Sequence, residues 1–149
     1  MTARIVEKTV NKDLKILNLN AMKLSQLPDF SRIMREMQGI TELNLAKNNL
    51  FNTEQVFQSL SNLGNLVKLN LSHNFLNGVL SSYIGDMTQI EEINMSVNQL
   101  SVLPASMGNL TNLKVLLLAD NSISEIPLVC YHIIFVCIKI KRYTYINIY

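Results

Sequence analysis

The chain has 149 residues, and 48% of them are hydrophobic, which is enough apolar material for one domain with an extended core. Lys and Arg number 13 and Asp and Glu number 11, so the net charge is only +2, and no stripe of basic residues of the kind that nucleic-acid binding requires is present. Composition and charge therefore argue against a disordered chain and against a nucleic-acid partner.

The first thirteen residues are expected to form an N-terminal cap. Ile5, Val6 and Val10 lie among charged residues in a pattern that is compatible with a short amphipathic helix over residues 1–13. The same stretch lacks the uninterrupted apolar segment and the small-residue cleavage site of a secretory signal. We therefore expect a capping helix and a cytoplasmic protein.

Five segments then repeat the pattern L-x-x-L-x-L-x-x-N-x-L. They begin at Leu14, Ile40, Leu66, Ile90 and Leu113, in steps of 26, 26, 24 and 23 residues. Over residues 14–127 this pattern resembles the leucine-rich repeat family, and its variants are similar to the short intracellular Ras-suppressor type and to the plant type. The resemblance implies an α/β solenoid, a curved horseshoe with a parallel sheet on its concave face and helices or turns on its convex face.

Each repeat divides its residues by role. The first, fourth and sixth positions are expected to point inward from a short strand, as Leu66, Leu69 and Leu71 do in the third repeat. The ninth position is an amide that can satisfy backbone groups of adjoining coils where the strand turns away. We therefore predict a structural Asn ladder, which consists of Asn48, Asn74, Asn98 and Asn121.

The segments between strands differ along the chain. Residues 28–38 and 52–63 carry apolar side chains at helical spacing, and Asn52 and Thr53 can cap the second segment, so both are predicted to be helices. The later segments are richer in Gly and Ser and include Pro104. These segments are predicted to form turns or single helical turns.

Residues 128–149 form an apolar tail that departs from the repeat. Its composition leaves two principal interpretations open, a degenerate capping strand that covers the end of the sheet and a non-native ending. Leu128 to Ile140 is too short for the roughly 20 residues that a membrane-spanning helix requires, which makes membrane attachment the less favoured interpretation.

Function is expected on the concave surface, because the inward positions are needed for packing. Its outward columns are polar and mixed in charge and become apolar toward the last repeat, a composition that suits a protein partner. The predicted partner-binding residues are Glu42, Asn44, Lys47, Lys68, Asn70, Ser72, His73, Glu92, Asn94, Val115 and Leu117.

The sequence offers no pairing of a nucleophile with a base, no phosphate-binding loop and no cluster of metal ligands, so we predict no catalytic residues, no metal site and no cofactor. The leading interpretation is a protein-interaction module that acts as an adaptor or regulator in intracellular signalling. The alternative is an N-terminal fragment of a larger leucine-rich repeat receptor or multidomain regulator that lacks its effector region.

Overall fold

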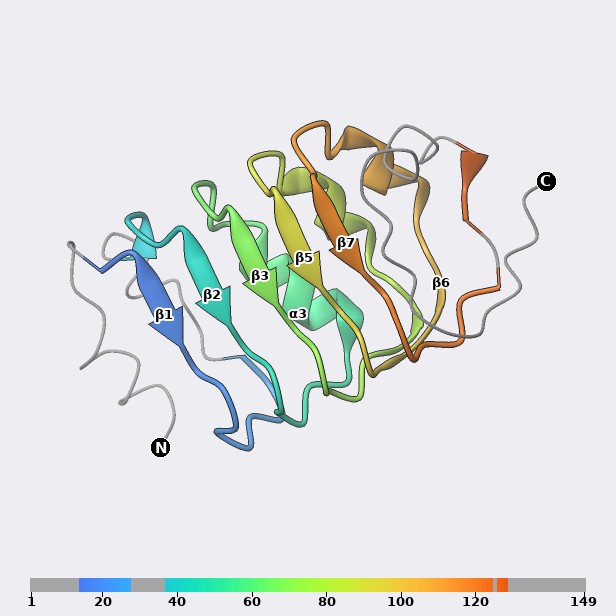
Figure 1. Cartoon of the computed structure of the whole chain (residues 1–149), viewed down its shortest axis with the longest axis horizontal. Coiled ribbons are helices and arrows are strands. Elements are labelled where there is room, and N and C mark those ends of the chain that lie inside the picture. The colour runs from blue at the N-terminus through green and yellow to red at the C-terminus, as the bar shows by residue number, and fades with distance from the viewer. Residues whose placement is uncertain (1–13, 28–36, 125, 129–149) are drawn as a thin grey trace.

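Within the described residues, a parallel sheet of five short strands forms one face of the molecule (Figure 1). A computed structural model describes residues 14–27, 37–124 and 126–128. The strand order is β1-β2-β3-β5-β7. These strands are Ile16–Asn18, Glu42–Asn44, Lys68–Asn70, Glu92–Asn94 and Val115–Leu117. The helices and turns lie behind the sheet, so the predicted leucine-rich repeat solenoid is confirmed.

The register of the sheet follows from the repeat itself. Leu43 pairs with Leu69, and Leu69 pairs with Ile93, so residues at the same repeat position pair between neighbouring strands. Leu66 and Leu71, with the strand residue Leu69, are at most 2% exposed, as the inward positions require. No coil could bury these side chains alone, and stacking of successive coils produces one continuous core.

The convex side changes with the length of the repeat. In the second repeat, which has 26 residues, helix α3 spans Thr53–Leu60, and the Asn52 side chain accepts a hydrogen bond from Gln55 N at 3.0 Å. In the third and fourth repeats, with steps of 24 and 23 residues, the 3₁₀ segments η2 (Ser82–Asp86) and η3 (Ala105–Asn109) take its place. The predicted helix over 52–63 and the later single turns are thus confirmed, because shorter repeats leave room for one tight turn only.

A second, two-stranded sheet was not predicted. Strands β4 (Asn77–Val79) and β6 (Gln99–Val102) pair in parallel, and the register shifts between Gly78 and Val79. Each strand follows its own Asn-ladder residue, so it lies on the flank between the concave sheet and the convex segments. The residues of β4 and β6 do not alternate between polar and apolar strongly enough to predict these strands from sequence.

Three predictions fall outside the described residues. These are the capping helix over 1–13, most of the helix over 28–38, and the tail over 128–149 apart from Leu128. Met37, near the end of the second segment, is described and is fully buried. Within the described ranges, every helix is too short and too polar to cross a bilayer.

The eighth residue of every repeat adopts a left-handed backbone. These residues are Ala21, Lys47, His73, Val97 and Asp120, and their φ angles lie between 54° and 57°. The turn directs the chain away from the strand while the backbone keeps bonding to the next coil, as in the 2.9 Å bond from Lys47 N to Ser72 O. None of the five is Gly or Asn, the residues that normally indicate this conformation.

Val97→Asn is expected to raise the free energy of unfolding by about 1 kcal/mol. A β-branched residue at φ 57° is strained, and Asn tolerates that region far better. Val102→Asn is the matched control, because Val102 is also exposed but lies in β6 without a positive φ, where Asn should be neutral or slightly destabilising. Urea denaturation of both variants provides the measurement, and equal shifts would show that Val97 is unstrained.

Candidate functional site

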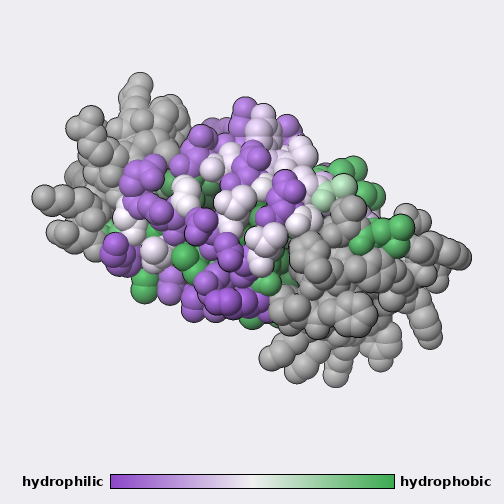
Figure 2. Space-filling view, turned by 90° about the horizontal axis from the view of Figure 1, so that it is seen from above, coloured by the Kyte–Doolittle hydropathy of each residue, from purple (hydrophilic) through white to green (hydrophobic). Residues whose placement is uncertain are grey.

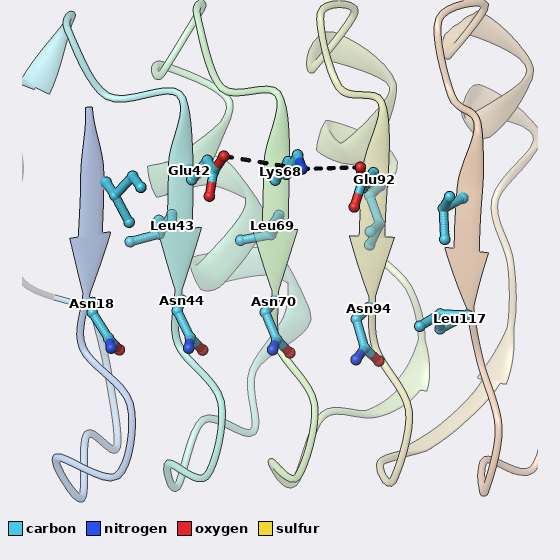
Figure 3. A pocket seen from close by; sticks show the side chains of 13 residues that line it. Asn18, Glu42, Leu43, Asn44, Lys68, Leu69, Asn70, Glu92, Asn94 and Leu117 are labelled. Carbon is cyan, nitrogen blue, oxygen red and sulfur yellow. Dashed lines mark ion pairs between the residues drawn. The ribbon is translucent and has the colours of Figure 1, made fainter.

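The concave face of the sheet contains a shallow hollow of about 370 Å³ (Figure 3). Its lining comes from the third and fifth positions of the repeats, which point outward from the strands, and from the backbone and buried side chains between them. The outward residues are Ile16, Asn18, Glu42, Asn44, Lys68, Asn70, Glu92, Asn94, Val115 and Leu117. All five strands therefore contribute to one surface.

A row of alternating charges crosses the middle of the hollow. Lys68 Nζ lies 3.1 Å from Glu92 Oε1 and 4.0 Å from Glu42 Oε1, and all three side chains are between 42% and 45% exposed. The hydrogen bond to Glu92 and the two neighbouring carboxylates raise the pKa of Lys68 above its ordinary value, so the ammonium stays protonated at neutral pH. Two carboxylates against one ammonium leave this row with a net negative charge.

A row of asparagines runs beside the charges, because the last residue of β1, β2, β3 and β5 is an asparagine (Figure 3). Each Oδ1 accepts a hydrogen bond from the backbone N–H two residues later, at 3.0 Å for the pairs Asn44–Ala46, Asn70–Ser72 and Asn94–Ser96. Asn18 makes the same bond to Asn20 at 3.1 Å. These side chains thus form Asx turns that help the chain leave the strand, a structural role in addition to their exposure.

The row of asparagines ends at an apolar corner. On β7 the equivalent residue is Leu117, and Val115 takes the place of the charged residues. Both side chains are partly exposed, and Figure 3 shows Leu117 in line with the Asn side chains of the other four strands. The outward residues of the hollow are therefore polar on β2, β3 and β5 and apolar on β7, and β1 contributes the apolar Ile16 beside the polar Asn18.

The structure brings together eight of the eleven predicted partner-binding residues. They are Glu42, Asn44, Lys68, Asn70, Glu92, Asn94, Val115 and Leu117. Ile16 and Asn18 complete the hollow, and the signal for them was present, because they occupy the same third and fifth repeat positions.

The other three predicted residues lie elsewhere. Lys47 and His73 are exposed but do not line the hollow, because they occupy the left-handed position after the strand has ended. Ser72 is only 7% exposed, and it lies in a column of small residues where neighbouring coils pack closely. Its assignment to the binding surface is corrected, since it offers a partner almost no surface.

The ninth-position asparagines lie in the turn after each strand and bond to two coils at once, and Asn48, Asn74 and Asn98 are buried while Asn121 is partly buried. Asn48 Nδ2 donates to Leu19 O and Leu45 O, both at 2.9 Å, and its Oδ1 accepts from Met22 N and Leu24 N, both at 3.0 Å. Asn74, Asn98 and Asn121 likewise donate to a carbonyl of the preceding coil, and the Oδ1 of each accepts one backbone hydrogen bond from that coil. This network fills the turn beside the hollow and holds its strands at constant spacing.

Further amide bonds connect the coils on the convex side. Asn65 Nδ2 donates to Gln38 O at 2.8 Å, and Asn112 Nδ2 donates to Thr88 O at 2.9 Å. These bonds were not predicted from the sequence, although both asparagines directly precede the first position of a repeat.

The chemistry of the hollow suits recognition. Its polar groups are amides, two carboxylates and one ammonium, which can exchange hydrogen bonds and charge with a ligand. Across the described ranges, no three His, Cys, Asp or Glu side chains gather closely enough to hold a metal ion.

The comparisons with known proteins agree with this architecture. A family model described as leucine rich repeat matches residues 64–123. A probable serine/threonine-protein kinase, pats1 of Dictyostelium discoideum, is 35% identical over 119 residues, which cover 76% of this chain and 4% of the kinase. Adenylate cyclase of Schizosaccharomyces pombe is 35% identical over 114 residues, which cover 76% of this chain and 6% of the cyclase.

A solved structure shows the same fold in a complex. A chain in the crystal structure of the BIR3–SERK2 complex of Arabidopsis thaliana superposes with a TM-score of 0.63 and 29% identity, covering 78% of this chain and 61% of that chain. The chain spans 4% to 6% of the length of the two curated relatives. The similarity therefore concerns a repeat region and leaves the rest of those proteins unmatched.

Proposed function

Because this chain is a member of the leucine-rich repeat family, we propose that it is a protein-interaction module that binds a partner protein through the hollow of its concave sheet. We further propose that it acts as an adaptor or regulator in signalling in the cytoplasm. The observation that carries the proposal is the exposed row of Glu42, Lys68 and Glu92, set in a hollow to which all five strands contribute.

The composition of the hollow supports a protein partner. Amides and opposite charges lie beside an apolar corner, which is the mixture found where polar rims surround small apolar centres in protein interfaces. The Asn ladder beside it connects each coil to the next by hydrogen bonds, so we expect little ordering of the surface when a partner binds. The match to a chain of a solved protein complex is consistent with this use of the fold.

Reversing the signs of the charged row should abolish partner binding. The triple variant Glu42→Lys, Lys68→Glu, Glu92→Lys keeps alternating charges, so the internal ion pairs and the fold are expected to persist while the pattern that a partner meets is inverted. Like charges placed opposite one another in an interface cost several kcal/mol, so we expect capture of partners from the native lysate to fall at least about tenfold. Quantitative affinity purification with wild type and variant provides the measurement.

The matched control is the pair Glu91→Lys, Lys114→Glu. Lys114 Nζ lies 2.7 Å from Glu91 Oε2, and neither residue lines the hollow. Reversing this ion pair inverts two charges outside the hollow and leaves the net charge unchanged, whereas the triple variant inverts three charges and makes the net charge more positive by two. This control should keep its partners. A folded triple variant that retained every partner would eliminate the concave hollow as the binding surface.

A second candidate is that these repeats are the binding part of a larger receptor or multidomain regulator. It is favoured by the small fraction of each curated relative that the chain spans, 4% of the kinase and 6% of the cyclase. An antibody raised against the repeats would distinguish the two on a blot of native lysate. A band near 16.9 kDa supports the separate module, and a much larger band alone supports the larger protein.

A further inference from the structure

The hollow presents the charged residues of β2, β3 and β5 between two apolar ends, Ile16 on β1 and Val115 with Leu117 on β7, and this arrangement restricts what can bind. We propose that it takes an extended peptide segment that runs across the strands and places a basic side chain over Glu42 and an apolar side chain, four residues away, against Val115 and Leu117. The inference rests on the proposed function, because it specifies the partner of the same surface.

The asparagine row supplies donors. The Oδ1 atoms of Asn44, Asn70 and Asn94 already accept backbone hydrogen bonds at 3.0 Å. Within the described part of the chain their Nδ2 groups donate to nothing, while each is partly exposed to the hollow. A ligand laid along this row therefore meets amide N–H groups and must provide acceptors, which the carbonyls of an extended backbone do.

The charged row favours a basic group at one point. Lys68 is hydrogen-bonded to Glu92 and lies 3.1 Å from it, whereas its distance to Glu42 is 4.0 Å, too long for a hydrogen bond. Glu42 thus keeps more of its accepting capacity than Glu92 does. With a net negative charge along the row, the complementary side chain is an Arg or Lys, and Glu42 is the carboxylate available to it.

The spacing follows from the sheet. Glu42 lies on β2 and Leu117 on β7, with β3 and β5 between them. Three strand intervals of about 4.8 Å amount to roughly 14 Å, and an extended chain advances about 3.4 Å per residue, so the two contacts fall about four residues apart. Residues four apart in an extended segment point to the same side, which allows both to face the hollow.

A displayed library of random twelve-residue peptides, selected against the full chain, tests the proposal. Enriched peptides are expected to carry Arg or Lys four positions from Leu, Ile, Val or Phe. A synthetic peptide of that sequence should bind Glu42→Gln and Leu117→Asn each about tenfold more weakly in fluorescence polarisation, since each variant removes one of the two anchoring contacts. Glu91→Gln, the same substitution outside the hollow, should bind like wild type.

Several results would overturn the proposal. These are selection of no peptide, selection of peptides that lack the basic and apolar pair, or equal affinity of the selected peptide for wild type and Glu42→Gln. If one of these occurs while the charge-reversed triple variant still loses its partners, the concave surface remains the binding site and only the extended peptide with its paired residues is wrong.

Discussion

Gly85→Ala is expected to lower the free energy of unfolding by about 3 kcal/mol. A Cβ atom at residue 85 would lie 2.6 Å from the backbone oxygen of Ser106 and 2.7 Å from its Cβ, well inside the closest distances that real contacts show. Neither atom is the end of a flexible side chain, so η2 and η3 would have to separate. That movement would also disturb the 2.8 Å bond from Ser106 Oγ to Ser82 O, which connects the two coils.

Gly64→Ala is the matched control for this substitution. No atom lies within 4 Å of the position that its Cβ would take, and its φ is not in the left-handed range. The added methyl should therefore leave stability unchanged or raise it by about 0.4 to 1 kcal/mol through the unfolded chain. Urea denaturation measures both variants, and comparable stabilities would mean that the two coils are not in close contact at Gly85.

The loss of stability caused by Gly85→Ala should differ from coil to coil along the solenoid. Each coil of a repeat protein is stabilised mainly by its neighbours, so separating η2 from η3 weakens the interface between the third and fourth repeats. Amide hydrogen exchange should accelerate most in β3 and β5, the strands of these two repeats, and least in β1, which lies two coils from β3. Uniform acceleration would indicate that the described coils unfold as a single unit.

Asn74→Ala is the second large effect, and we expect it to lower the free energy of unfolding by about 3 kcal/mol. Asn74 is 5% exposed, and its Nδ2 donates to Leu45 O and Leu71 O at 3.0 Å while its Oδ1 accepts from Leu50 N at 3.1 Å. Leu45 O and Leu71 O keep a second donor, from Asn48 Nδ2 and Asn98 Nδ2, but removing the amide leaves Leu50 N buried without a partner. Such a group costs about 1 to 3 kcal/mol, reduced where water can enter the space left behind.

Asn49→Ala, the same substitution at an exposed position of the preceding coil, should change stability by no more than about 0.5 kcal/mol. Thermal and urea denaturation of the two variants provide the comparison. If they were equally stable, the buried amide would contribute nothing beyond filling space.

Asn74→Asp tests which half of the amide matters. The carboxylate can still accept from Leu50 N, but it places negative oxygens against the carbonyls that accept hydrogen bonds from Nδ2 in the wild type. The Asn74→Asp variant should therefore be less stable than Asn74→Ala at neutral pH. Burial raises the pKa of such a carboxyl in the folded state above its unfolded value. The variant should therefore regain stability as pH falls through that raised folded pKa, relative to wild type at each pH.

Much of the fold could be predicted because the repeat aligns with itself. Steps of 23 to 26 residues bring Glu42, Lys68 and Glu92 into neighbouring register positions, so their proximity follows from the sequence once strands are assigned. Helix α3 could also be predicted, since its apolar spacing and the Asn52 cap are both local. The unequal distances from Lys68 to the two carboxylates could not, because they depend on side-chain packing across strands.

The sequence by itself determined which residues become neighbours along the solenoid, because a fixed period stacks each position on its own equivalent. Only the tertiary structure decided where the side chains point once the strand ends. The left-handed turns at Lys47 and His73 move both side chains out of the hollow, and close packing of coils buries Ser72. The period of the repeat determines which residues of neighbouring coils are in contact, whereas the direction of a side chain after a turn depends on hydrogen bonds to the next coil.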